Sequence, residues 1–151
     1  MKRIESINLH SAPASDAGLE AIGKLTSLRR LEIVHTDVSD AGLKHLAALV
    51  NLRQLHVHGP KATADALPFL AGLTELVELD VYGPPAGNKT LALIARLPKL
   101  KSLMLPEGHH DDEGVKHLAG VTTLEALTLD SAKVTDASVP HLSKLANLRK
   151  L

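Results

Sequence analysis

The stretch "LTSLRRLEIVHTDVSDAGLKHLAAL", residues 25–49, changes its apolar spacing halfway along its length. In its first half, Leu31 and Ile33 stand two residues apart, which places both side chains on one face of a short strand. In its second half, Leu43 and Leu46 stand three residues apart, which places both on one face of a helical turn. The stretch therefore predicts a strand that is followed by a short helix.

The polar segment between the two halves predicts where the helix begins. Ser39 or Asp40 can accept a hydrogen bond from the first free N–H groups of that helix. Similar segments recur as "ASDAGLEAI", "HDDEGVKHL" and "VTDASVPHL". The column of predicted cap positions reads Asp16, Asp40, Ala64, Asn88, Asp112 and Asp136, so the polar pattern weakens in the middle of the chain.

The same apolar pattern repeats along the whole chain at an interval of 24 residues. One column of equivalent positions reads Ile4, Leu28, Leu52, Leu76, Leu100, Leu124 and Leu148. A single strand and helix cannot bury their apolar sides alone, so such units stack and share one core. The sequence predicts one α/β solenoid domain over residues 1–151, with six full repeats and the start of a seventh.

The repeat resembles the leucine-rich-repeat family. "LRRLEIVHT", residues 28–36, fits the pattern L-x-x-L-x-L-x-x-N with Thr36 in the Asn position. The longer stretch "LRRLEIVHTDVSDAGLKHL" looks like a bacterial variety that is related to the cysteine-containing repeats of F-box proteins. The resemblance implies a curved parallel sheet on the concave side, short helices on the convex side, and protein binding.

The chain departs from the family pattern at its turns and at its ends. The column that usually carries Asn reads Ala12, Thr36, Pro60, Pro84, Gly108 and Ala132, so only Thr36 can donate from its side chain to the turn backbone. Pro and Gly are expected to set the other turns. Neither end carries a recognisable cap, which is typical of a fragment of a longer array. We also expect self-association through an open apolar end formed by Leu145, Leu148 and Leu151.

Composition excludes several classes of function. The 17 basic and 17 acidic residues cancel, so bulk charge does not favour a nucleic-acid or membrane-surface partner. Without cysteine the chain forms neither disulfides nor thiolate metal sites. The first ten residues lack the apolar core of a signal peptide, and we expect a cytoplasmic location.

The strand residues that alternate with the core predict the binding surface. They face away from the helices, and those of the second to fourth repeats form a mixed patch on the concave face. Tyr82 is the one tyrosine of the chain, and a tyrosine among polar residues is typical of a binding anchor. The hypothesis is a docking site for a protein or peptide at Arg30, Glu32, Val34, His56, His58, Glu78, Asp80 and Tyr82.

Histidines suggest two alternative metal sites, and we expect neither to bind metal. His56 and His58 share one strand face, with Glu32 and Asp80 predicted to flank His56, but ligands fixed on a rigid sheet rarely converge on one ion. The segment "GHHDDEG", residues 108–114, holds four possible ligands that point in different directions. His45, His117 and His141 are expected to lie half-buried on the convex side, too far apart to share an ion.

We find no catalytic motif, so the sequence predicts a binding protein that is not an enzyme and that needs no cofactor. It has no G-x-S-x-G turn and no G-x-x-x-x-G-K-[ST] phosphate loop. Basic residues are dispersed and aromatic residues are nearly absent, which argues against nucleic-acid binding. Three further interpretations stay open. They are a substrate-recognition arm of a larger ubiquitin-ligase-like or effector protein, a structural scaffold without a ligand, and a metal-dependent enzyme or metal sensor that uses His56 and His58.

Overall fold

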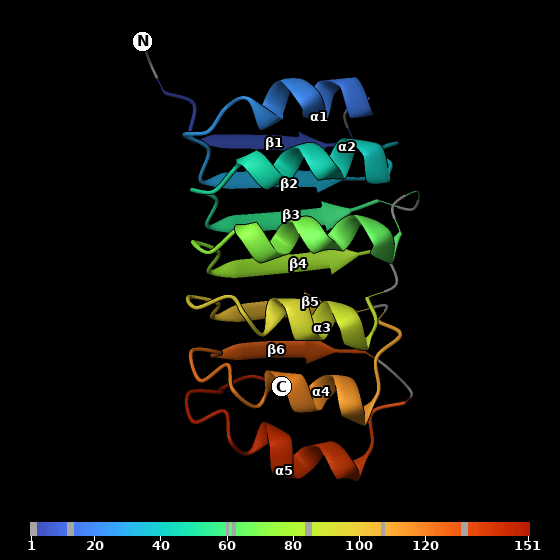
Figure 1. Ribbon diagram of the computed structural model, residues 1–151, viewed down its shortest axis with the longest axis vertical. Helices are drawn as coiled ribbons and strands as arrows, with labels where there is room; N and C mark the ends of the chain where they lie inside the picture. Colours follow the sequence, from blue (N-terminus) through green and yellow to red (C-terminus); the bar gives the residue numbers. More distant parts are fainter. Residues whose placement is uncertain are drawn as a thin grey trace.

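The computed structural model describes residues 3–11, 14–59, 61, 63–83, 86–106, 108–130 and 133–151. Its centre is a parallel sheet of six strands that lie in chain order (Figure 1). Each strand pairs in register with the strand one repeat later, so that Leu31 lies beside Leu55. The strands are β1 (Ser6–His10), β2 (Arg30–Val34), β3 (Gln54–His58), β4 (Glu78–Tyr82), β5 (Ser102–Leu105) and β6 (Ala126–Leu129).

Short helices stack over one face of this sheet and leave the other face open (Figure 1). Some are α-helices and others are 3₁₀-helices. The helix η2 (Ala64–Gly72) is a 3₁₀-helix over its whole length and contains Pro68. Proline lacks the N–H group that an α-helical turn uses. The helices are α1 (Asp16–Gly23), α2 (Asp40–Lys44), η1 (His45–Ala48), η2 (Ala64–Gly72), α3 (Asn88–Ile94), α4 (Asp112–Leu118), η3 (Asp136–Ser138) and α5 (Val139–Leu142).

The core between sheet and helices consists of the repeated aliphatic columns. In one column of equivalent positions, the leucines of the inner repeats are fully buried, namely Leu28, Leu52, Leu76, Leu100 and Leu124. Each buried leucine side chain contributes about 1.5–3 kcal/mol relative to an exposed one. The predicted period therefore determines which residues touch, because every core side chain packs against its own counterpart in the next repeat.

A polar ladder joins the first turns of successive helices, and it corrects the predicted caps. The capping side chain is the residue before the predicted column: Ser39 Oγ accepts from the backbone N–H of Ala41. The column residue instead bridges to the next repeat. Asp16 accepts from the backbone N–H of Ser39 at 2.9 Å and from its hydroxyl at 2.6 Å, and Asp40 accepts from Thr63 in the same way.

The ladder continues in the later repeats after one gap. Asn88 exchanges hydrogen bonds with Asp111, and Asp112 accepts from the backbone and hydroxyl of Thr135. Between the third and fourth repeats the sequence has alanine at position 64, and Gly87, which caps α3, has no side chain to donate. The chain therefore lacks this bridge between η2 and α3.

Glycine at position 42 makes room for the ladder. A Cβ atom built there would stand 2.4 Å from an Asp16 carboxylate oxygen, so any larger residue would displace the bridge. The bridge lowers the pKa of Asp16, first through the hydrogen bond from the Ser39 hydroxyl. The pKa of Asp40 is lowered in the same way by Thr63. These carboxylates therefore stabilise the fold in their charged form.

The turns that follow the strands differ from the prediction for Thr36. Its side chain is buried, but Thr36 Oγ1 has no hydrogen-bond partner among the described residues, so it does not donate to the turn. Left-handed backbone conformations shape these turns, with φ of 53° at His35 and 107° at Gly83. Four residues of the predicted turn column, Ala12, Pro60, Pro84 and Ala132, lie outside the described residues.

The predicted apolar C-terminal end is only partly open. Leu145 is buried and Leu148 is half-buried against the core, whereas Leu151 is 78% exposed. The backbone just before Leu151 pairs with β6, because the Leu127 N–H donates to the Lys150 carbonyl at 3.0 Å. Among the described residues, no helix is long and apolar enough to cross a membrane.

Removal of one ladder carboxylate should destabilise the protein. We expect Asp40→Ala to lower the free energy of unfolding by about 2 kcal/mol, because it removes a charged acceptor of two hydrogen bonds. Asp40→Asn keeps an acceptor, as Asn88 does, and should cost less than half as much. Urea denaturation measures both, with Asp37→Ala at an exposed position as the control. Equal losses for Asp40→Ala and the control would contradict the ladder.

Candidate functional site

The open sheet face is the surface formed by the outward side chains of the six strands. On its N-terminal half these side chains bond to one another. Glu32 accepts from Arg30 Nε at 3.0 Å on its own strand and from the Asn8 amide on β1. Arg30 and Glu32 were both predicted to bind a partner, and here they pair with each other on β2.

The two strand histidines pair diagonally with carboxylates of β4. His56 Nε2 lies 2.8 Å from Glu78, which also accepts from the Gln54 amide, and His58 Nε2 lies 2.9 Å from Asp80. Glu32 and Asp80 flank His56 in the strand register, as predicted, but the His56 ring pairs with Glu78 instead of either of them. Glu78 is the register neighbour of Gln54 and Asp80 that of His56, so each carboxylate pairs with the histidine two positions further along β3.

Two exposed apolar side chains and a carboxylate that lacks one hydrogen bond lie on the open sheet face where β4 meets β5. Tyr82 is 41% exposed, and Met104, the register neighbour of Asp80 on β5, is 42% exposed. The Tyr82 ring lies against the ring of His58, with centroids 5.4 Å apart. Asp80 Oδ2 pairs with His58, but Asp80 Oδ1 is buried and has no hydrogen-bond partner among the described residues. We call Asp80, Tyr82 and Met104 the Tyr82 patch.

Two predictions for this face need correction. Val34 is only 7% exposed, so it belongs to the buried part of the sheet and offers a partner little surface. Met104 was placed in an outward column but left out of the predicted site. Met104 stands opposite Asp80 in the 24-residue register, and neighbouring strands lie about 4.8 Å apart. The register alone therefore predicts that Met104 belongs to the same surface as Asp80.

The described residues contain no group of three His, Asp or Glu side chains that could hold a metal ion. His56 and His58 each bond to a different carboxylate. In the segment at residues 108–114, Asp111 caps α4 and Asp112 bridges to Thr135, so both acids have structural roles. The sequence placed Asp112 at the cap, one residue too late.

Comparison with models of known protein families and with curated proteins gives no match. Solved structures do match. One is an internalin (inlF) from Listeria monocytogenes, with a TM-score of 0.66 and 19% identity over 97% of this chain and 47% of the internalin. Another is an internalin C2 (inlC2) from the same organism, with a TM-score of 0.66 and 19% identity over 98% of this chain and 80% of that one. The chain spans about half the length of the first.

The fold is a leucine-rich-repeat solenoid. Internalins are leucine-rich-repeat proteins, and at 19% identity the likeness concerns the fold alone. The parallel sheet and the short helices on one of its faces agree with the α/β architecture that the sequence predicts.

The solenoid buries one histidine in a position that other repeats fill with valine or alanine. His110 is fully buried, and its counterparts include Val38 and Ala86, which are buried too. A Cβ atom at Gly108 would overlap the imidazole, so glycine there leaves the space that the ring needs. Burial lowers the pKa of His110, while the Ala86 carbonyl and the Asp111 carboxylate act in the opposite direction. The residue is therefore part of the core.

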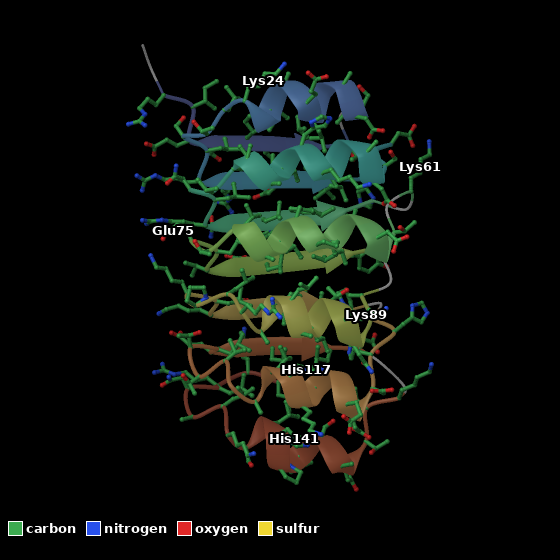
Figure 2. The ribbon with its side chains drawn as sticks, in the orientation of Figure 1. Lys24, Lys61, Glu75, Lys89, His117 and His141 are labelled. Atoms are coloured by element: carbon green, nitrogen blue, oxygen red, sulfur yellow. The ribbon has the colours of Figure 1, made fainter. Side chains whose placement is uncertain are left out.

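The histidines of the helical side lie on separate helices, as Figure 2 shows for His117 on α4 and His141 on α5. His141 is half-buried, as predicted. His45 and His117 are exposed, so the prediction of half-buried positions is wrong for these two.

His110 should make the stability of the solenoid depend on pH. Unfolding exposes the imidazole, whose ordinary pKa is about 6.5, so below that pH the unfolded chain binds more protons than the folded one. The free energy of unfolding should fall by at most about 1.4 kcal/mol per pH unit below 6.5 from this group. His110→Val, which copies Val38, should remove that slope. Urea denaturation at pH 7.5, 6.0 and 5.0 measures it, and an unchanged slope would contradict this role.

Proposed function

We propose that the chain is a protein-recognition module without enzymatic activity, and that it binds a segment of a protein partner on the open sheet face. The Tyr82 patch carries this proposal. Tyrosine and methionine are both enriched where proteins bind each other, and here they are exposed on the neighbouring strands β4 and β5. A rigid surface loses little conformational entropy when a partner binds.

The chemistry of the patch indicates what the partner presents. A buried carboxylate oxygen without a hydrogen bond is costly, and a donor from a partner would satisfy Asp80 Oδ1. The charged residues that we predicted for the site are Arg30, Glu32, Glu78 and Asp80, so acidic groups outnumber basic ones. We therefore infer a segment with an apolar side chain for Tyr82 and Met104, next to an N–H or cationic donor for Asp80.

This proposal also includes the wider biological setting. The resemblance to the repeats of F-box proteins supports a role as the substrate-recognition arm of a larger ubiquitin-ligase-like or effector protein. A cytoplasmic location fits that role. A chain that serves only as a scaffold would bind no segment at this face.

The test compares two double variants that remove equal numbers of exposed apolar side chains. Peptides would be selected on the wild-type protein from a random display library, and their affinities measured by fluorescence anisotropy. Tyr82→Ser with Met104→Ser should weaken binding at least about 10-fold. Val50→Ser with Val139→Ser, at positions 49% and 57% exposed outside the strands, should change affinity less than 2-fold.

Three results would overturn the proposal for the sheet face. The first is that no peptide is enriched on the wild-type protein. The second is that both double variants lose affinity equally. The third is that the patch variant binds as tightly as wild type. Circular dichroism and urea denaturation would show that all the variants are folded.

A further inference from the structure

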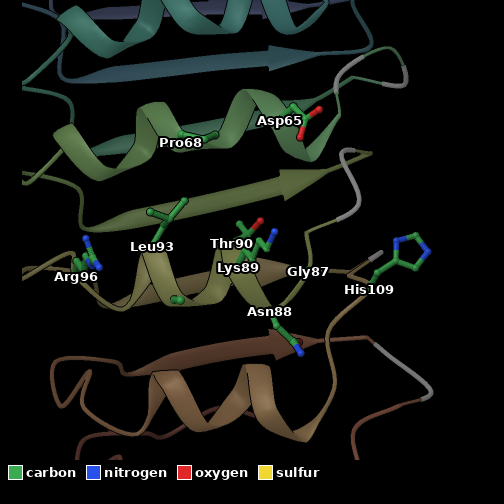
Figure 3. A pocket seen from close by; sticks show the side chains of 10 residues that line it. Asp65, Pro68, Gly87, Asn88, Lys89, Thr90, Leu93, Arg96 and His109 are labelled. Carbon is green, nitrogen blue, oxygen red and sulfur yellow. The ribbon is translucent and has the colours of Figure 1, made fainter.

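The helical side of the solenoid contains a groove between η2 and α3. Its volume is about 620 Å³, and its walls include Asp65 and Pro68 from η2 and Lys89, Leu93 and Arg96 from the α3 side. In Figure 3, Leu93 is directed from α3 toward η2, with Lys89 and Arg96 toward opposite ends of α3. The groove lies on the other side of the sheet from the Tyr82 patch.

The groove lies where three features weaken the contact between neighbouring repeats. The ladder bridge is missing at Gly87. Pro68 stands inside η2, and its ring faces the groove in place of a longer side chain. The pairing of β4 with β5 covers three residue pairs, whereas the three preceding strand pairs cover five each. These sequence-encoded differences all fall at the junction where the groove lies.

The two cations of the groove have no ion pair within the described part of the chain. Other lysines pair with a nearby acid, as Lys24 does with Glu20 and Lys99 with Glu75. Lys89 and Arg96 are exposed, and neither has an ion-pair partner among the described residues. Asp65 is the one acidic residue of the lining, so the groove carries two permanent positive charges against one negative charge.

The placement of the two cations suits a ligand with two separate anionic groups. Lys89 lies in the first turn of α3 and Arg96 lies two residues past the end of this helix, so the two side chains stand toward opposite ends of the groove (Figure 3). At roughly 1.5 Å per residue, their backbone positions are about 10 Å apart. An extended peptide advances about 3.3 Å per residue, so two acidic side chains three residues apart span the same distance.

We propose that this groove binds an acidic, extended peptide segment of a partner protein, with two carboxylates three residues apart and an apolar side chain between them. The carboxylates pair with Lys89 and Arg96, and the apolar side chain packs against Leu93 and Pro68. The negative charge of Asp65 repels a third acidic residue of the peptide at the end of the groove where Asp65 lies. This site is independent of the proposed function of the open sheet face.

The test uses a fluorescein-labelled heptapeptide, Gly-Ser-Asp-Leu-Ser-Asp-Gly, whose two aspartates stand three positions apart. The control is a labelled peptide of the same sequence with Asn in place of both Asp residues. Fluorescence anisotropy at low salt should show binding of the acidic peptide that is at least about 10-fold tighter than that of the Asn peptide. Lys89→Glu with Arg96→Glu should abolish this preference. Asp65→Asn should strengthen it.

A charge-matched control separates this site from general attraction. Lys24→Glu with Lys44→Glu changes the net charge by the same amount on helices that do not line the groove, and it should leave the preference within 2-fold. Tyr82→Ser with Met104→Ser should also leave it unchanged, which distinguishes failure of this site from failure of the sheet face. Equal binding of both peptides, or equal loss in the charge-matched control, would overturn the proposal.

Discussion

The fold depends on the contact of each residue with its own counterpart 24 positions later. Because Leu31 packs beside Leu55, a side chain that fits one layer of the stack must also fit the next. This requirement explains the nearly uniform aliphatic core, since one large aromatic ring in a column would disturb both neighbouring layers. Phe69 is the one phenylalanine of the chain, and it lies on η2 at the edge of the core rather than in a sheet column.

The polar ladder fixes the orientation of each repeat relative to the next within this apolar stack. Hydrophobic columns alone tolerate small rotations between repeats, whereas Asp16 and Asp40 fix the first turn of one helix against the capping residue of the next. Where the ladder lapses at Gly87, the helices leave the groove between η2 and α3. The same local change in sequence therefore weakens the array and creates a surface that differs from the rest of it.

The sequence predicted the repeat, the strand positions and the outward columns, because these follow from periodicity alone. It could not predict which side chains on the open face bond to each other. His56 and His58 each pair with the β4 carboxylate that stands two positions before their own register neighbour, and this diagonal offset depends on side-chain geometry across the strands. The sequence also left the cap of α2 open between Ser39 and Asp40, because both are good cap residues and only the next repeat reveals that Asp40 is needed elsewhere.

The most direct test of recognition by the open sheet face uses the methionines as probes. The chain has two, Met1 and Met104, and Met104 lies on β5 beside Asp80. A peptide selected on the wild-type protein would be titrated into protein with ¹³C-labelled methionine methyl groups. The account predicts that the Met104 signal shifts in proportion to occupancy while the Met1 signal stays in place. A Met104 signal that does not move at saturation would contradict it.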